Sequence, residues 1–149
     1  METSPGSYVE IRRPWRSGDT LNMNLPMPVR RVECHPYVTE NTRRVALMRG
    51  PLLYCVEQAD NHEVDLRNVI LEDAGPAARY DPELLGGVTV LQAEARIAAP
   101  EVGWEDRLYR TVHPGEGGTR TDAGEITFVP YYTWATREPG AMRVWIRSG

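Results

Sequence analysis

The sequence predicts an all-β protein, an antiparallel two-sheet β-sandwich of the jelly-roll kind with little helix. Many short segments are rich in apolar residues, and only one has spacing that suits a helix. Breaks rich in glycine and proline separate them, for example at 50–51, 75–76, 86–87 and 139–140. Because 149 residues suit one core, we expect residues 8–149 to form a single domain. Residues 1–7 are expected to be linker or added residues.

The first two strands are predicted to pair as a hairpin. Residues 8–13 carry Val9 and Ile11 on one face, and Ser17-Gly18-Asp19 has the composition of a turn. Residues 21–27 then alternate apolar residues with two asparagines and a proline, which places the apolar side chains on one face of an extended strand. These apolar residues are Leu21, Met23, Leu25 and Met27.

Six further strands are predicted from apolar and β-branched runs, at Val29–Cys34, Val45–Met48, Leu52–Glu57, Val88–Arg96, Ile126–Tyr132 and Met142–Arg147. In the last strand, Met142, Val144 and Ile146 should face inward. Residues 60–71 have mixed spacing that could suit one or two helical turns capped by Asp60 or Asn61, and we interpret them as extended. Residues 113–125, rich in glycine and charge, are expected to form a hairpin tip or an ordered loop.

Two strands are apolar on both faces. The runs VALM at 45–48 and LLYCV at 52–56 do not alternate, so both sides of this part of the sheet should be covered. If the cover lies outside the chain, the isolated protein should expose an apolar patch or self-associate. Cys55 lies in the second run and is interpreted as a small buried hydrophobic residue.

Charge and composition argue against nucleic-acid and membrane partners. The formal net charge is −4, and the densest basic patch, RRPWR at 12–16, is short and isolated. No segment approaches the ~18 consecutive apolar residues of a membrane span, and the first residues lack the pattern of an export signal. We therefore expect a cytoplasmic protein in which both cysteines, Cys34 and Cys55, are reduced.

No metal site is predicted. The residue types that bind zinc occur at Cys34-His35, Cys55, His62 and His113, but none of the paired spacings of zinc sites is present. These residues are interpreted as packed or solvent-facing.

Paired carboxylates do not predict a glycosidase site either. Such enzymes hold two carboxylates roughly 5–9.5 Å apart across the sugar bond. Glu72-Asp73 and Glu105-Asp106 are adjacent in sequence, and adjacent residues of a strand point to opposite faces. We interpret both pairs as solvated charges.

The aromatic residues are the best candidates for a site. Tyr132 and Trp134 would share one strand face with Tyr131 opposite, and Trp15 lies close to arginines. Flat rings near guanidinium groups suit either a domain interface or the C–H faces of a sugar, and interface packing is the favoured interpretation. The predicted contact residues are Trp15, Arg16, Tyr131, Tyr132, Trp134 and Arg137.

Three segments together resemble a known family. Residues 8–30, 43–57 and 126–147 are similar in order and spacing to the C-terminal β-sandwich region of the β-L-arabinofuranosidase family of glycoside hydrolases, family 127. The most specific string is PYYTWATREPGAMRVW at 130–145. This chain departs from the usual pattern at Thr136, Glu138 and Ala141, where the family has Asn, Gly and a polar residue.

The resemblance implies that the chemistry lies elsewhere. In the family, a cysteine nucleophile and a zinc ion are held on an N-terminal (α/α)₆ barrel marked by an adjacent cysteine pair. This sequence has no such pair, so no catalytic or metal residue is carried over to it, and zinc is implied only for the barrel. The barrel of the same polypeptide is the implied partner.

Three hypotheses follow. The first is a non-catalytic accessory domain that supports the barrel. The second is a free-standing carbohydrate-binding module that contacts a glycan, and the third is a self-contained enzyme.

Overall fold

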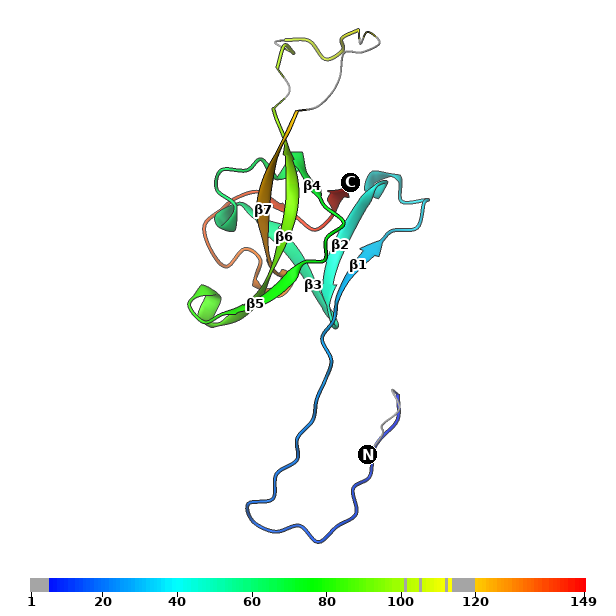
Figure 1. The fold of residues 1–149 in the computed structure, drawn as a ribbon, viewed down its shortest axis with the longest axis vertical. Coiled ribbons are helices and arrows are strands. Elements are labelled where there is room, and N and C mark those ends of the chain that lie inside the picture. Colours follow the sequence, from blue (N-terminus) through cyan, green and yellow to red (C-terminus); the bar gives the residue numbers. More distant parts are fainter. Residues whose placement is uncertain (1–5, 101, 105, 112, 114–119) are drawn as a thin grey trace.

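A computed structural model describes residues 6–100, 102–104, 106–111, 113 and 120–149, and over these residues the fold is nearly all β. Helical structure in this part consists of five three-residue 3₁₀ turns (Figure 1). The strands are β1 (Val29–Glu33), β2 (Arg44–Arg49), β3 (Leu52–Glu57), β4 (Val69–Leu71), β5 (Ala77–Asp81), β6 (Val88–Ala98), β7 (Thr121–Pro130), β8 (Met142–Arg143) and β9 (Ile146–Ser148). The turns are η1 (Thr39–Asn41), η2 (Gln58–Asp60), η3 (Leu66–Asn68), η4 (Leu84–Gly86) and η5 (Tyr131–Thr133).

The strands form one hydrogen-bonded network. Its order is β1-β2-β9-β4-β6-β7-β3-β8, and β5 pairs with β6. Because β2 also pairs with β3, the six strands β2, β9, β4, β6, β7 and β3 close into a ring of pairings. The pairings are antiparallel apart from β4 with β9, which is parallel. The all-β prediction is confirmed, but two separate antiparallel sheets in a jelly roll are not.

The longest pairing is the β6–β7 hairpin, which runs from Leu91 opposite Phe128 to Ala98 opposite Thr121. In Figure 1 the two strands run side by side through the body. Alternate residues of β6 point into the main core, which contains Leu91 together with Tyr54, Phe128 and Ile146, all at most 1% exposed. Strand alternation therefore determines which side chains the hairpin buries.

Both apolar runs are covered by the chain itself. Val45 and Leu47 of β2, and Tyr54 and Val56 of β3, belong to the main core. Cys55 points to the other face of β3, where a second cluster covers it. That cluster contains Val88, Val90 and Val129, with Leu84, Leu85, Met142 and Val144 packed against it. The prediction that both faces of these strands are covered is confirmed. At Cys55 the covering side chains belong to the described chain itself.

Most predicted strands are present, and two of them have different bounds. The predicted strand at 126–132 begins earlier and ends at Pro130, after which the chain turns into η5. The predicted strand at 142–147 is two strands, because the chain leaves β3 after Arg143 and joins β2 and β4 from Ile146. Met142, Val144 and Ile146 do pack inward.

The segment 60–71 contains η3 and β4, and the short turn is capped by Asp65, not by Asp60 or Asn61. Strand β5 was not predicted; its residues are mostly exposed and show no alternation. The predicted loop at 113–125 lies partly outside the described residues, and β7 already begins at Thr121.

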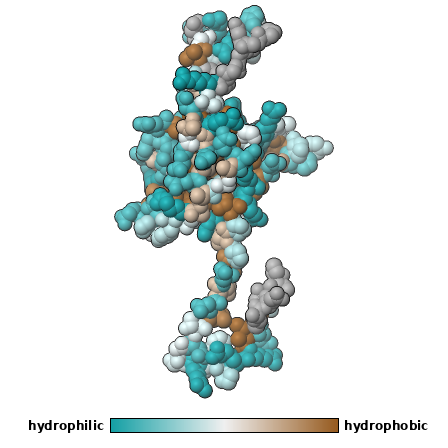
Figure 2. Space-filling view, viewed as in Figure 1, coloured by the Kyte–Doolittle hydropathy of each residue, from teal (hydrophilic) through white to brown (hydrophobic). Residues whose placement is uncertain are grey.

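The predicted hairpin at 8–27 is wrong for this chain. Residues 8–27 contain no strand and run outside the body as the U-shaped segment at the bottom of Figure 1. Figure 2 shows apolar surface along this segment, away from the body. Two isolated strands are marginal in water, so alternation alone does not form a hairpin here.

No helix within the described residues has the length and apolarity needed to cross a membrane.

Candidate functional site

The loop that follows β7 gathers four of the six predicted contact residues. Tyr131 and Tyr132 lie in η5, and Trp134 follows directly. The rings of Tyr131 and Trp134 stack with centroids 5.7 Å apart at an interplanar angle of 26°. Tyr131, Tyr132 and Trp134 are 39%, 67% and 44% exposed, so all three rings of the loop reach solvent.

Arg137 attaches this loop to the end of β3. Its guanidinium donates from Nη1 and Nη2 to the two carboxylate oxygens of Asp60, both at 2.6 Å, and from Nη2 to Glu57. The second oxygen of Glu57 accepts from the backbone N–H of Ala135 at 3.2 Å. The hydrogen bonds to Asp60, with the one to Glu57, raise the pKa of Arg137 above its ordinary value. Arg137 therefore stays charged and holds the loop in one conformation.

The loop backbone depends on this attachment. Ala135 has a φ of 61°, a conformation that costs free energy for a residue with a Cβ. Gly140, where the loop returns to β8, packs so closely on Gln58 that a Cβ there would have no room. The aromatic rings are thus carried by a strained and tightly held turn.

The Glu57–Asp60 pair does not form a catalytic dyad. The side chains are 9% and 8% exposed, and both carboxylates share the guanidinium of Arg137. A general acid must carry a proton and reach its substrate. Two carboxylates that share one guanidinium and are covered by the loop are not placed to reach a substrate, so we interpret their role as structural.

The structure separates Trp15 and Arg16 from the other four residues. Both lie in the segment outside the body, where Trp15 packs under the guanidinium of Arg13 at 5.0 Å. The backbone N–H of Arg16 donates to Asp19 at 2.9 Å. The six predicted residues therefore belong to two distinct places, the aromatic loop and the N-terminal segment.

Asn61 is a key residue that the sequence interpretation missed. It is 7% exposed, and its Nδ2 donates to the carbonyls of Glu57 at 2.9 Å and Thr127 at 3.1 Å. Its Oδ1 accepts from the N–H of Thr127 at 3.0 Å. Beyond Cys55, β3 pairs with β8 and no longer with β7. The Asn61 amide therefore satisfies backbone groups of β7 that a neighbouring strand would otherwise pair with.

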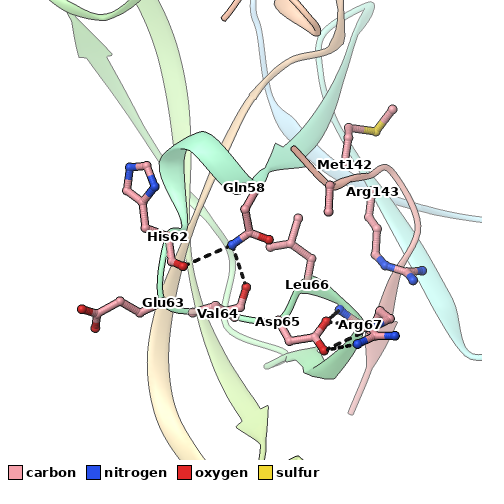
Figure 3. Close-up of a pocket in the computed structure, with 10 residues that line it drawn as sticks. Gln58, His62, Glu63, Val64, Asp65, Leu66, Arg67, Met142 and Arg143 are labelled. Carbon is pink, nitrogen blue, oxygen red and sulfur yellow. Dashed lines mark hydrogen bonds and ion pairs between the residues drawn. The ribbon is translucent and has the colours of Figure 1, made fainter. Parts of the chain in front are cut away.

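A hollow of about 550 Å³ lies next to the loop attachment (Figure 3). One wall is the segment 62–67, held by Gln58, whose Nε2 donates to the carbonyls of Asn61 at 2.7 Å and Val64 at 3.0 Å. Within this segment, Asp65 and Arg67 form an ion pair with more than one hydrogen bond. The hydrogen bonds from Arg67 lower the pKa of Asp65 to about 2. The charges of Asp65 and Arg67 therefore neutralise one another at this wall of the hollow.

The candidate zinc ligands are not brought together. Cys55 is fully buried in the second cluster, whereas the sulfur of Cys34 accepts from Asn41 Nδ2 at 3.4 Å. Within the described ranges, no group of three or more His, Cys, Asp or Glu could hold a metal ion. The cysteines and histidines described here therefore do not fit a zinc site.

We expect the two thiols to differ in reactivity. Burial raises the pKa of Cys55 to about 12, so at pH 8 its thiolate is almost absent and its sulfur is inaccessible. Cys34 is partly exposed. Ellman's reagent should therefore label one thiol in the native protein and two in urea. The Cys34→Ser variant should show no rapid native labelling, and rapid labelling of that variant would contradict a buried Cys55.

Of the two acidic pairs, Glu72-Asp73 lies at the surface, and each of its carboxylates forms an ion pair with an arginine. Glu72 contacts Arg96 at 2.6 Å, and Asp73 lies 3.7 Å from Arg31. Glu105 falls outside the described residues, so the second pair is not placed.

Comparison with known proteins gives consistent matches. The profile described as the glycoside hydrolase family 127 C-terminal domain matches residues 29–147. A non-reducing end β-L-arabinofuranosidase of Bifidobacterium longum subsp. longum is 39% identical over 138 residues, which cover 88% of this chain and 20% of that protein.

Solved structures of similar proteins also match this chain. The crystal structure of a family 127 β-L-arabinofuranosidase from Geobacillus stearothermophilus T6 superposes with a TM-score of 0.69 at 40% identity, covering 83% of this chain and 19% of that one. A structure described as a glycoside hydrolase gives a TM-score of 0.69 at 31% identity, covering 83% of this chain and 20% of that chain. This chain thus spans about one fifth of the length of these relatives.

Proposed function

Because the chain belongs to the C-terminal domain family of glycoside hydrolase family 127, we propose that it is a non-catalytic accessory domain of a β-L-arabinofuranosidase-like enzyme. In this proposal it packs against an N-terminal catalytic domain of the same polypeptide, an (α/α)₆ barrel that carries the zinc ion and the nucleophile. The relatives are β-L-arabinofuranosidases, and this chain spans about one fifth of their length, which supports this division.

The observation that carries the proposal is the attached aromatic loop. Tyrosine and tryptophan are enriched in the centres of protein interfaces, because they bury a large area with few rotatable bonds. Here the loop is already held by Arg137, Glu57 and Asp60, so little conformational entropy is lost when a partner covers it. Stacking also uses one face of Tyr131 and one face of Trp134, which leaves less ring surface for a sugar.

The chemical groups of the chain support a non-catalytic role. Its buried carboxylates are held by a cation, and its buried thiol is protonated near neutral pH. Glycoside hydrolysis needs an acid and a nucleophile or base on the two sides of one bond. The described residues offer no such arrangement.

A two-piece experiment tests the interface. The N-terminal remainder of the longer polypeptide and this chain are expressed separately, and their association is measured by calorimetry. The double variant Tyr131→Ala/Trp134→Ala should bind at least about tenfold more weakly, as expected for interface aromatic anchors. Tyr37→Ala is the matched control, because Tyr37 is 89% exposed and lies outside the loop. Equal affinity of both variants would contradict the proposal.

The same proteins test the alternatives. Titration of this chain with arabino-oligosaccharides should give no binding heat, and a chromogenic β-L-arabinofuranoside should not be cleaved. Glycan binding that is lost in Trp134→Ala, without association of the two pieces, would instead establish a carbohydrate-binding module. Turnover by this chain alone would establish a self-contained enzyme.

A further inference from the structure

The hollow in Figure 3 has two walls that come from distant parts of the chain. One wall is the segment 62–67, and the other is formed by residues 141–143. Gln58 holds both walls, because its backbone N–H donates to the carbonyl of Ala141 at 2.9 Å and its Nε2 donates to the carbonyl of Val64 at 3.0 Å. The hollow is therefore formed before any ligand arrives, which lowers the entropic cost of binding.

Strand alternation directs Arg143 into this hollow. Met142 packs against the second cluster, and adjacent residues of a strand point to opposite faces. The side chain of Arg143 consequently leaves β8 on the other face, where it lines the hollow. Figure 3 shows its guanidinium on the same side of the hollow as Asp65 and Arg67.

The guanidinium of Arg143 is the unpaired charge of the hollow. Asp65 is already satisfied, because Nε, Nη2 and the backbone N–H of Arg67 all donate to its carboxylate at 2.7 to 3.1 Å. These hydrogen bonds are the main reason that the pKa of Asp65 is low, and the charge of Arg143 adds a smaller effect. Over the described ranges, no residue forms a hydrogen bond or ion pair with Arg143. Glu63 points away from this group in Figure 3, so this end of the hollow carries two guanidinium groups and one carboxylate.

The groups that line the hollow suit a ligand with one carboxylate and several hydroxyls. The planar fork of an arginine binds a carboxylate with two parallel hydrogen bonds. Val64 is partly buried against the main core and offers apolar surface to the C–H face of a ring. The Nε2 of Gln58 is occupied by backbone carbonyls, which leaves the carboxamide oxygen to accept from a hydroxyl. The volume of about 550 Å³ lies in the range of small-molecule sites and is far more than one acidic side chain would fill.

We propose that this hollow binds a sugar acid, a saccharide unit that carries a carboxylate, with the carboxylate on the guanidinium of Arg143 and beside Arg67. That the ligand is a saccharide rests on the proposed function, since the longer polypeptide would then act on glycans. The site is separate from the aromatic loop and holds an acidic unit of a glycan without cleaving it. Neutral arabinosides lack the carboxylate, so they are not expected to bind here.

Titration of the 149-residue chain with sodium D-glucuronate, followed by calorimetry, tests the inference. Two ligands are matched to it: D-glucose has the ring without the carboxylate, and sodium acetate has the carboxylate without the ring. Glucuronate should bind at least about tenfold more tightly than either, and added salt should weaken its binding. No binding of glucuronate would overturn the inference. Equal binding of acetate or inorganic phosphate would show a general anion site and would also overturn it.

Three arginine variants locate the site. Arg143→Met should weaken glucuronate binding at least about tenfold, because methionine keeps much of the apolar stem but removes the fork. Arg67→Met should weaken it as well, because Asp65 is then free to pair with Arg143. Arg79→Met is the matched control, since Arg79 forms an exposed ion pair with Asp81 outside the hollow. Urea unfolding checks that each variant is folded. Unchanged binding in Arg143→Met, or an equal loss in Arg79→Met, would overturn the inference.

Two further measurements separate this site from the proposed interface. Tyr131→Ala/Trp134→Ala should keep glucuronate binding, and its loss would place the ligand on the aromatic loop and overturn the inference. The longer polypeptide should bind glucuronate as well as the 149-residue chain does; failure to bind would show that the preceding domain covers the hollow, which overturns it too. If the two pieces associate but glucuronate does not bind, this inference fails and the accessory function stands. If glucuronate binds through Arg143 but the two pieces do not associate, the accessory interface fails and the site stands.

Discussion

Replacing Arg137 with methionine is expected to lower the free energy of unfolding by about 3 kcal/mol, because it leaves two buried carboxylates without their cation. Glu57 and Asp60 are 9% and 8% exposed, and each bonds directly to the guanidinium. Breaking a buried ion pair usually costs about 3–5 kcal/mol, and the 21% exposure of Arg137 places the effect at the lower end. Urea unfolding followed by tryptophan fluorescence and circular dichroism measures it.

Two comparison variants separate the effect of leaving the buried carboxylates unpaired from that of simply losing an arginine side chain. Arg67→Met removes a similarly forked Arg–Asp pair at the surface, where the Arg67 side chain is 74% exposed, and should leave the unfolding midpoint nearly unchanged. The triple variant Arg137→Met/Glu57→Gln/Asp60→Asn removes all three charges and should recover much of the loss. If Arg137→Met is no more harmful than Arg67→Met, the attachment of the aromatic loop described above is wrong.

Replacing Asn61 with alanine is expected to cost about 2–3 kcal/mol, because three backbone groups lose their partners at once. The carbonyls of Glu57 and Thr127 and the N–H of Thr127 all bond to the Asn61 side chain. Asn61→Asp should also destabilise the domain, since a carboxylate cannot donate to two carbonyls. The measurement is again urea unfolding at neutral pH.

The matched control is Asn24→Ala, at an exposed asparagine, which should change the free energy of unfolding of this chain by no more than about 0.5 kcal/mol. Hydrogen exchange adds a local test, because the Thr127 amide should lose protection in Asn61→Ala. A stable Asn61→Ala variant with a protected Thr127 amide would show that β7 does not depend on this side chain.

The strands that the sequence predicted correctly are those with their own apolar signal. Val45, Leu47, Leu91 and Phe128 lie in runs whose burial follows from neighbouring residues, so local pattern was enough. Strand β5 lacks such a signal, because it is an outer strand with four of its five residues exposed. The segment at 21–27 has the apolar alternation of a strand but forms none, because nothing in the described chain covers Leu21, Met23 and Leu25.

For the candidate site too, local sequence pattern could predict only the residues that lie close together in the chain. The string that contains Tyr131, Trp134 and Arg137 is local, and the structure keeps these residues in one loop. The partners of Arg137 lie 77 and 80 residues away, and Asn61 meets Thr127 across 66 residues. Such pairings arise from the path of the chain, and no short-range pattern encodes them. Trp15 and Arg16 were grouped with the loop because they have the same residue types, which does not determine proximity.

The closed ring of paired strands also has a consequence for how the domain folds. Strand β9, only three residues long, joins β2 and β4, which lie about 75 to 105 residues earlier in the chain. Until Ile146 to Ser148 have been synthesised, β2 and β4 have no shared neighbour, and their unpaired edges resemble those that recruit other chains. Contacts between residues so far apart in sequence slow folding, because the intervening chain must first be ordered. The domain is therefore expected to complete its folding only after its last strand has left the ribosome, in milliseconds to seconds rather than microseconds, and to need protection from aggregation during that interval.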